Sequence, residues 1–182
     1  MSISTPTRTI NGSSGVVKAD KPAAPLDTIL HELLCIAQRA GACRVHVETF
    51  DYEGRPILSV LDNGSGIDSP RALVALDGFG WRDVRPRSRT PSGVALSSLV
   101  GRHTIVRSGP DETEPASSVT IPAEAWNGEA SIAIEPEGGL CGTNIMVEIP
   151  EEWRTGLEDA VTAAARHVPM HVFFHARWKN LD

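Results

Sequence analysis

The stretch Leu61-Asp62-Asn63-Gly64-Ser65-Gly66-Ile67 decides how the rest of this chain is interpreted. It follows an apolar, β-branched run, residues 56–61, that is typical of a buried strand. The strand ends at a carboxylate followed by two glycines, which allow positive φ and let a flat ligand approach the backbone. An ionised aspartate only accepts hydrogen bonds, so Asp62 is suited to an exocyclic amine. Taken alone, the stretch favours the simpler interpretation, a strand followed by an Asp-Asn-Gly turn.

Three further segments give this stretch its context. Residues 32–42 read Glu-Leu-Leu-Cys-Ile-Ala-Gln-Arg-Ala-Gly-Ala, residues 92–99 read Ser-Gly-Val-Ala-Leu-Ser-Ser-Leu, and residues 142–147 read Gly-Thr-Asn-Ile-Met-Val. With the Asp62 stretch they resemble, in order, the motifs of the GHKL ATPases, the superfamily of DNA gyrase, the ninety-kilodalton heat-shock chaperones, histidine kinases and the MutL proteins. The MutL motifs are the most similar, over roughly residues 26 to 176.

The resemblance implies a site for ATP. Asp62 would contact adenine, Glu32 would activate the attacking water, and Thr143 would reach the phosphates. Gly93 would begin a helix whose free N–H groups and positive dipole end suit phosphate binding. The expected nucleotide-binding residues are therefore Asp62, Gly64, Gly66, Ile67, Gly93, Val94, Ala95, Leu96 and Thr143.

One family position is changed in a way that bears on catalysis. The asparagine that binds magnesium one turn after the glutamate is Ile36 here. Isoleucine has no oxygen for a hard cation, so no residue of the chain is assigned as a metal ligand. Because magnesium neutralises the phosphates during transfer, we expect ATP binding with weak or absent hydrolysis. Magnesium can still arrive bound to the nucleotide. Glu32 remains either a catalytic base or a relic.

Two alternatives stay open. One is a non-catalytic interaction or structural module on the same scaffold, and the other is an active ATPase with unconventional magnesium ligation. The Asp62–Gly64–Gly66 box together with Thr143 favours nucleotide binding over the module, and Ile36 speaks against the active enzyme.

Periodicity predicts the fold independently of the motifs. A helix is expected from Asp27 or Thr28, as N-cap, to Gly41, and a long amphipathic helix over residues 151–167. Strands are expected at 43–50, 56–62, 103–107, 117–121, 130–135, 143–149 and 171–174. Residues 69–76 and the Gly93 segment are expected to be helical, and the arginine-rich residues 77–92 to form a lid loop. This order predicts an α+β, two-layer sandwich with a mixed, mostly antiparallel sheet and helices on one face, which matches the Bergerat fold of the resembled family.

Length and composition fit one domain, residues 26–182, preceded by a mobile arm over residues 1–25 that is poor in large apolar side chains. The net charge of −6 gives no indication of a nucleic-acid partner. Three scattered cysteines and the lack of a signal-peptide core or membrane-length apolar run predict a cytoplasmic protein without a membrane partner. A homodimer, in which the arm would order, or a partner protein remains open.

Overall fold

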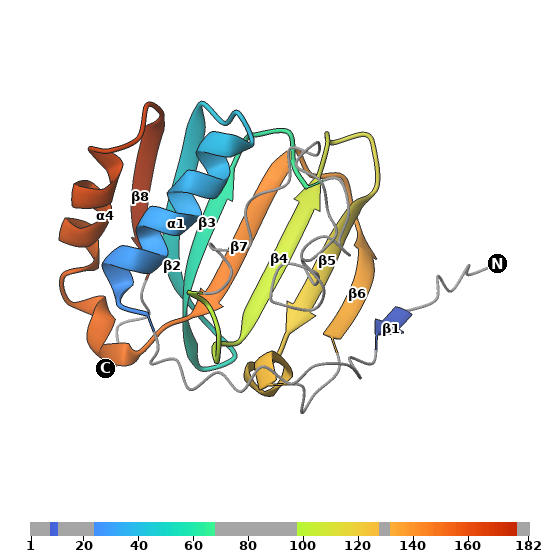
Figure 1. Cartoon of the computed structure of the whole chain (residues 1–182), viewed down its shortest axis with the longest axis horizontal. Coiled ribbons are helices and arrows are strands. Elements are labelled where there is room, and N and C mark those ends of the chain that lie inside the picture. The colour runs from blue at the N-terminus through green and yellow to red at the C-terminus, as the bar shows by residue number, and fades with distance from the viewer. Residues whose placement is uncertain (1–7, 11–23, 68–97, 128–131, 178–182) are drawn as a thin grey trace, which may run out of the picture.

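The computed structural model describes residues 8–10, 24–67, 98–127 and 132–177. Its strands form one eight-stranded sheet in the order β1-β6-β5-β4-β7-β3-β2-β8. Figure 1 shows helices α1 and α4 on the same face of this sheet, over β2, β3 and β8. Only β2 and β8 pair in parallel among the described strands, and the other neighbours are antiparallel. This arrangement confirms the predicted α+β two-layer sandwich with a mixed, mostly antiparallel sheet.

Helix α1 (Leu26–Arg39) carries most of the buried side chains of the two described α-helices. Its apolar side chains recur at helical spacing, and six of them are buried: Ile29, Leu30, Leu33, Leu34, Ile36 and Ala37. The predicted N-cap at Asp27 or Thr28 is wrong, because the helix begins at Leu26 with Pro25 in the cap position and no side-chain cap. The predicted end is confirmed, since Gly41 has φ of +74°.

Strands β2 (Arg44–Tyr52) and β3 (Arg55–Asp62) form a hairpin that carries the Asp62 stretch. Two residues connect them, Glu53 and Gly54, with φ of 52° and 77°. Positive φ at both positions gives a two-residue turn whose twist matches that of the strands. The hairpin turn is therefore shorter than the sequence suggested, and β2 continues to Tyr52. Alternation then fixes the faces: Val45, Val47, Leu58 and Val60 point into the core, and Asp62 shares their face.

The other half of the sheet follows from four more strands and a short helix. They are β4 (Thr104–Gly109), β5 (Ala116–Ile121), the 3-10 helix η1 (Ala123–Asn127), β6 (Ile132–Glu137) and β7 (Gly142–Glu148). Strand β7 lies between β4 and β3, which brings the segment around Thr143 next to the end of β3. Strand β1 (Arg8–Ile10) pairs with β6 at one sheet edge, so these three residues depart from the expectation of a mobile arm.

The predicted helix over residues 151–167 is wrong as a single element. The chain forms a 3-10 turn, η2 (Glu151–Arg154), and then α4 (Leu157–Ala165), separated by Gly156 with φ of +86°. A left-handed residue cannot continue an α-helix, so the break is local. Before the break, Trp153 packs against the Arg102 guanidinium, whose Cζ lies 4.5 Å from the ring centroid. Strand β8 (His171–Arg177) then closes the sheet beside β2.

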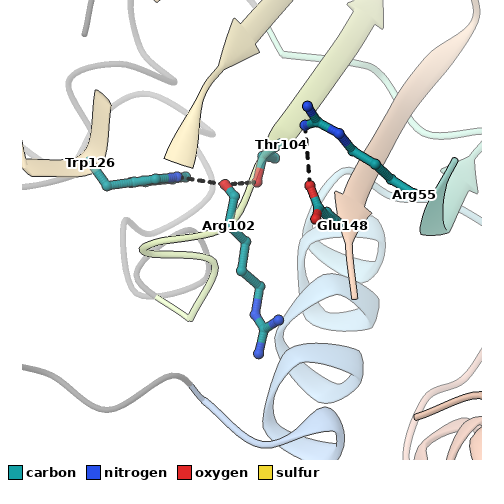
Figure 2. Close-up of polar contacts among 5 residues, drawn as sticks. All are labelled: Arg55, Arg102, Thr104, Trp126 and Glu148. Carbon is teal, nitrogen blue, oxygen red and sulfur yellow. Dashed lines mark hydrogen bonds and ion pairs between the residues drawn. The ribbon is translucent and has the colours of Figure 1, made fainter. Parts of the chain in front are cut away.

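The polypeptide leading into β4 is fixed by contacts to one backbone carbonyl. Figure 2 shows the Arg102 carbonyl accepting hydrogen bonds from Trp126 Nε1 at 2.8 Å and Thr104 Oγ1 at 3.1 Å. On the neighbouring strands, Arg55 forms an ion pair of 3.3 Å with Glu148. None of the helices that the structure describes is long and apolar enough to cross a membrane.

Candidate nucleotide site

Three adjacent strands bring polar side chains together at one end of the helix-covered face. Asp62 ends β3, Thr143 is near the start of β7, and Ser108 is near the end of β4. Ser108 and Thr143 are direct cross-strand partners. All three are buried, with exposed fractions of 5%, 1% and 6% respectively. Buried polar groups need partners, so this cluster is either internally satisfied or completed by a ligand.

The Asp62 carboxylate is held by backbone donors. Its Oδ1 accepts a hydrogen bond of 2.7 Å from the Gly64 N–H, and the Thr143 backbone also donates to the carboxylate. Burial raises the pKa of Asp62 above its ordinary value of 3.8, while these two hydrogen bonds lower it, and burial has the larger effect. A carboxylate offers about four lone-pair sites, so two backbone donors leave capacity for another donor.

Ser108 links the loop after Asp62 to β7. Its Oγ accepts from the Ile67 N–H at 2.8 Å and lies 3.2 Å from the Gly142 carbonyl and 3.0 Å from Thr143 Oγ1. The network therefore uses the backbone of Ile67, one of the predicted site residues. Ser108 was missed at the sequence level, because a single serine near the end of a strand carries no recognisable pattern.

The glycines of the stretch are required by contacts within the protein. A Cβ on Gly64 would lie 2.6 Å from Ala40 Cβ, and one on Gly66, which has φ of +71°, would lie 2.4 Å from the Gly109 carbonyl oxygen. The Ser65 N–H also donates to the Ala40 carbonyl at 2.9 Å. These contacts dock the loop onto the C-terminal end of α1 and onto β4. The glycines are thus explained by packing, and a role in ligand approach stays a prediction.

Asn63 fixes the same loop to β2. Its Oδ1 accepts from the N–H groups of Cys43 at 3.1 Å and Arg44 at 2.9 Å, and its own N–H donates to the Arg44 carbonyl at 3.2 Å. The backbone of the loop is therefore tied to three elements, α1, β2 and β4. The Asp62 side chain is presented from a preorganised support rather than from a free loop.

Glu32 and Ile36 lie one turn apart on α1 but have different surroundings. Glu32 is half-buried, and within the described part of the chain its Oε2 is buried without a hydrogen-bond partner. Ile36 is 3% exposed and belongs to the apolar core. A buried, unpaired carboxylate oxygen is costly, so a donor from solvent or a ligand is expected at Glu32. Ile36 offers nothing to a cation.

The structure brings together part of the predicted site. Asp62, Gly64, Gly66, Ile67 and Thr143 form one cluster. Thr143, expected to reach the phosphates, lies beside Asp62 and donates a backbone hydrogen bond to its carboxylate, and its role toward a ligand stays a prediction. Gly93, Val94, Ala95 and Leu96, the lid at 77–92 and the helix at 69–76 lie outside the described residues. Among the side chains that the structure places, no group of three or more His, Cys, Asp or Glu is arranged to hold a metal ion.

Comparisons with known proteins give a fold relationship. No protein-family model matches the chain, and no curated protein matches it. Among solved structures, it is similar to one described as the crystal structure of the N terminal domain of a DNA repair protein. The TM-score is 0.60 at 19% identity, and the match covers 85% of this chain and 49% of the other. The chain thus spans about half the length of that neighbour, and the likeness shows a shared fold.

Proposed function

We propose that this protein binds adenine nucleotides, ATP or ADP, and hydrolyses ATP weakly or not at all. The observation that carries this proposal is the Asp62 carboxylate, buried at the end of β3 and held by two backbone N–H groups with acceptor capacity left over. An adenine amine is a donor that this carboxylate can accept. Guanine presents a carbonyl at the corresponding position, so two acceptors would face each other.

The base would be bound by the cluster around Asp62. The Thr143 backbone donates to the carboxylate, and Ser108 fixes the Thr143 hydroxyl and the Ile67 backbone. The loop is already tied down by Asn63 and Ala40, so little ordering is needed when a ligand arrives. Support for the proposal therefore comes from the fit between one donor group and a preorganised acceptor.

The phosphates would extend along α1 toward Glu32. Glu32 precedes Ala40, which contacts the loop, by eight residues, a rise of about 12 Å along a helix. That direction leads from the contact between the loop and Ala40 to Glu32, whose Oε2 is buried with no hydrogen-bond partner among the described residues. The described residues do not fit a magnesium ion held by this helix, because the position one turn after Glu32 is a core isoleucine. Binding is therefore expected to depend little on magnesium.

A second candidate is a non-catalytic interaction module on a Bergerat scaffold. The specific observation in its favour is that the contacts of Gly64 and Gly66 with Ala40 and Gly109 explain both glycines without a ligand. The active ATPase with unconventional magnesium ligation is favoured only by Glu32 Oε2, which has no hydrogen-bond partner within the part of the chain that the structure describes. The proposal also includes a cytoplasmic location, which three free cysteines support. It further includes a homodimer or a partner protein.

Calorimetry on the full chain tests nucleotide binding. ATP is expected to bind with and without magnesium, and GTP about tenfold to a hundredfold more weakly, because an unmet buried acceptor costs roughly 1–3 kcal/mol. Asp62→Asn keeps an acceptor for Gly64 and should lose adenine selectivity. The control Asp159→Ala removes an exposed carboxylate on α4 and should change nothing. Equal affinities for ATP and GTP, or unchanged selectivity in Asp62→Asn, would leave the module as the better account.

Phosphate release separates the remaining alternatives. Hydrolysis by the wild-type protein is expected at or near background, and Glu32→Gln, of nearly equal size, should not reduce it further. Robust turnover that disappears in Glu32→Gln would establish the active enzyme instead.

A further inference from the structure

A cavity of about 260 Å³ lies on the sheet face opposite α1. Its floor is built by Ile57 on β3, Met146 on β7 and Ile105 on β4, three neighbouring strands. These residues alternate with the core residues Leu58, Val147 and Val106, which face the helix layer. The cavity lies toward the start of β3, whereas Asp62 ends that strand, so it is separate from the candidate nucleotide site.

The walls carry side chains that bind aromatic rings. Phe50 and Tyr52 from β2 form one side, and Tyr52 is 49% exposed. Arg55 and Arg107 also line the cavity, and a guanidinium binds the face of an aromatic ring. The Met146 thioether on the floor is polarizable, and its unbranched side chain adapts its shape to a ring lying on it. Ring stacking, cation–π and sulfur–ring contacts are therefore available around one small space.

The charges around the cavity indicate an uncharged occupant. Arg55 pairs with Glu148 at 3.3 Å, and Arg107 Nε lies 3.4 Å from Glu137 Oε2. An anion would have to compete with these carboxylates, and Glu53 in the lining opposes it further. A cation would meet the two guanidinium groups. The cavity volume is just below the roughly 300 Å³ at which pockets for drug-sized ligands begin, so a smaller molecule is expected.

We propose that this cavity is a binding site for a small, uncharged aromatic molecule of one or two fused rings. The ring would lie on Ile57, Ile105 and Met146, with Tyr52 covering one side and the arginines contacting its face. The site is independent of the proposed nucleotide binding, since none of its lining residues belongs to the cluster around Asp62.

Methionine-methyl NMR on the full chain, with indole as the probe, tests the site. The chain has three methionines, Met1, Met146 and Met170, and Met146→Leu assigns the relevant signal. Saturable upfield movement of the Met146 methyl is expected, because a ring face would lie over it, while Met170, packed against the helix-side core, stays unchanged. Absence of a Met146 shift up to the solubility limit of indole, or an equal shift at Met170, would overturn the proposal.

Two matched variants test the wall. Tyr52 and Phe173 are the two exposed large hydrophobic side chains among the described residues. Tyr52→Ala should weaken indole binding about three- to tenfold, the range of an aromatic pair, and Phe173→Ala should leave it unchanged. Equal effects of the two variants would indicate nonspecific surface binding and overturn the site.

Related probes test the ligand class. Tighter binding of indole-3-acetate than of indole would overturn the assignment of an uncharged ligand. Binding of a tryptophan-containing peptide without binding of free indole would assign the cavity to a partner protein rather than to a small molecule.

Discussion

The Gly64 N–H donates a hydrogen bond of 2.7 Å to Asp62 Oδ1, so the carboxylate proposed to bind a base also closes its own loop. The same side chain is buried, and it lies on the sheet face of the core residues Leu58 and Val60. Its stabilising hydrogen bonds and its desolvation act in opposite directions on the charged form, and the desolvation is larger. The residue is thus kept in place at a cost to stability near neutral pH.

Asp62→Asn is expected to raise the stability of the unliganded protein at pH 7. The folded-state pKa of Asp62 lies above the ordinary value of 3.8, so the folded state holds its proton more tightly than the unfolded state. Stability from this group is greatest below the unfolded pKa and is lost as pH rises through the folded pKa. An increase in Tm of about 2–4 °C would correspond to ~1 kcal/mol in a chain of this size.

Thermal unfolding of both proteins across the acid range checks this sign. Contributions from the other titrating groups cancel in the difference between the two curves. The difference should be small at a pH below 3.8 and grow as the pH rises. A variant that is less stable than the wild type at pH 7 would show that the Gly64 and Thr143 hydrogen bonds outweigh burial.

Gly66→Ala is expected to destabilise the fold far more than Gly54→Ala. Both glycines have positive φ, 71° and 77°, and the backbone penalty of about 1 kcal/mol applies to each. The new Cβ at position 66 would also lie 2.4 Å from the Gly109 carbonyl oxygen, whereas position 54 faces open space. A loss of at least about 3 kcal/mol is expected for Gly66→Ala in urea unfolding. Equal losses would mean that β4 and the loop can move apart.

Ser108→Ala is expected to weaken both the fold and nucleotide binding. It removes the acceptor of the Ile67 N–H, a buried group whose loss of a partner costs roughly 1–3 kcal/mol. It also removes the hydrogen bond to the Thr143 hydroxyl, on the residue whose backbone donates to Asp62. Ser59→Ala is the control. Ser59 Oγ donates a hydrogen bond of 2.8 Å to Asn144 Oδ1 and makes no contact in the Ser108 network described above. Denaturation measures the loss of stability in each variant. Calorimetry should show weaker nucleotide binding in Ser108→Ala and unchanged binding in Ser59→Ala.

Ile36→Asn is expected to increase the magnesium dependence of ATP binding while lowering stability. The substitution supplies an amide oxygen one turn after Glu32 but removes a core side chain that is 3% exposed. Ile36→Ala creates the same cavity without the oxygen, and both variants should lose about 2–5 kcal/mol. Calorimetry with and without magnesium then isolates the ligand effect. Similar magnesium dependence in the two variants would rule out ligation by Asn at this position.

Local pattern was sufficient for most elements of the fold. The helical spacing from Ile29 to Ala37 and the alternation from Val45 to Thr49 each require one particular buried face, so α1 and β2 follow from the sequence alone. Gly41 marks the helix end for the same local reason, its positive φ. The same pattern could not locate the break at Gly156. The amphipathic spacing continues across this residue, although its backbone is in the left-handed region.

The candidate site was only partly readable in this way. Asp62 and Thr143 each stand in a recognisable motif, but motifs carry no distances, and only the strand order β4-β7-β3 makes these residues neighbours. Ser108 carries no motif, and its role comes wholly from contacts with Ile67, Gly142 and Thr143, which are distant in the chain. The pairing of Arg8–Ile10 with β6 likewise depends on a sheet edge that residues 1–25 themselves do not encode.

The sequence by itself determined which residues face the core, where α1 ends, and that a carboxylate follows a buried strand, because these depend on periodicity and local backbone preference. Only the tertiary structure decided that Gly64 and Gly66 are needed by Ala40 and Gly109, and that Asp62 is desolvated beside Thr143. Steric contact and burial depend on atoms distant in the chain, and no local pattern encodes their positions.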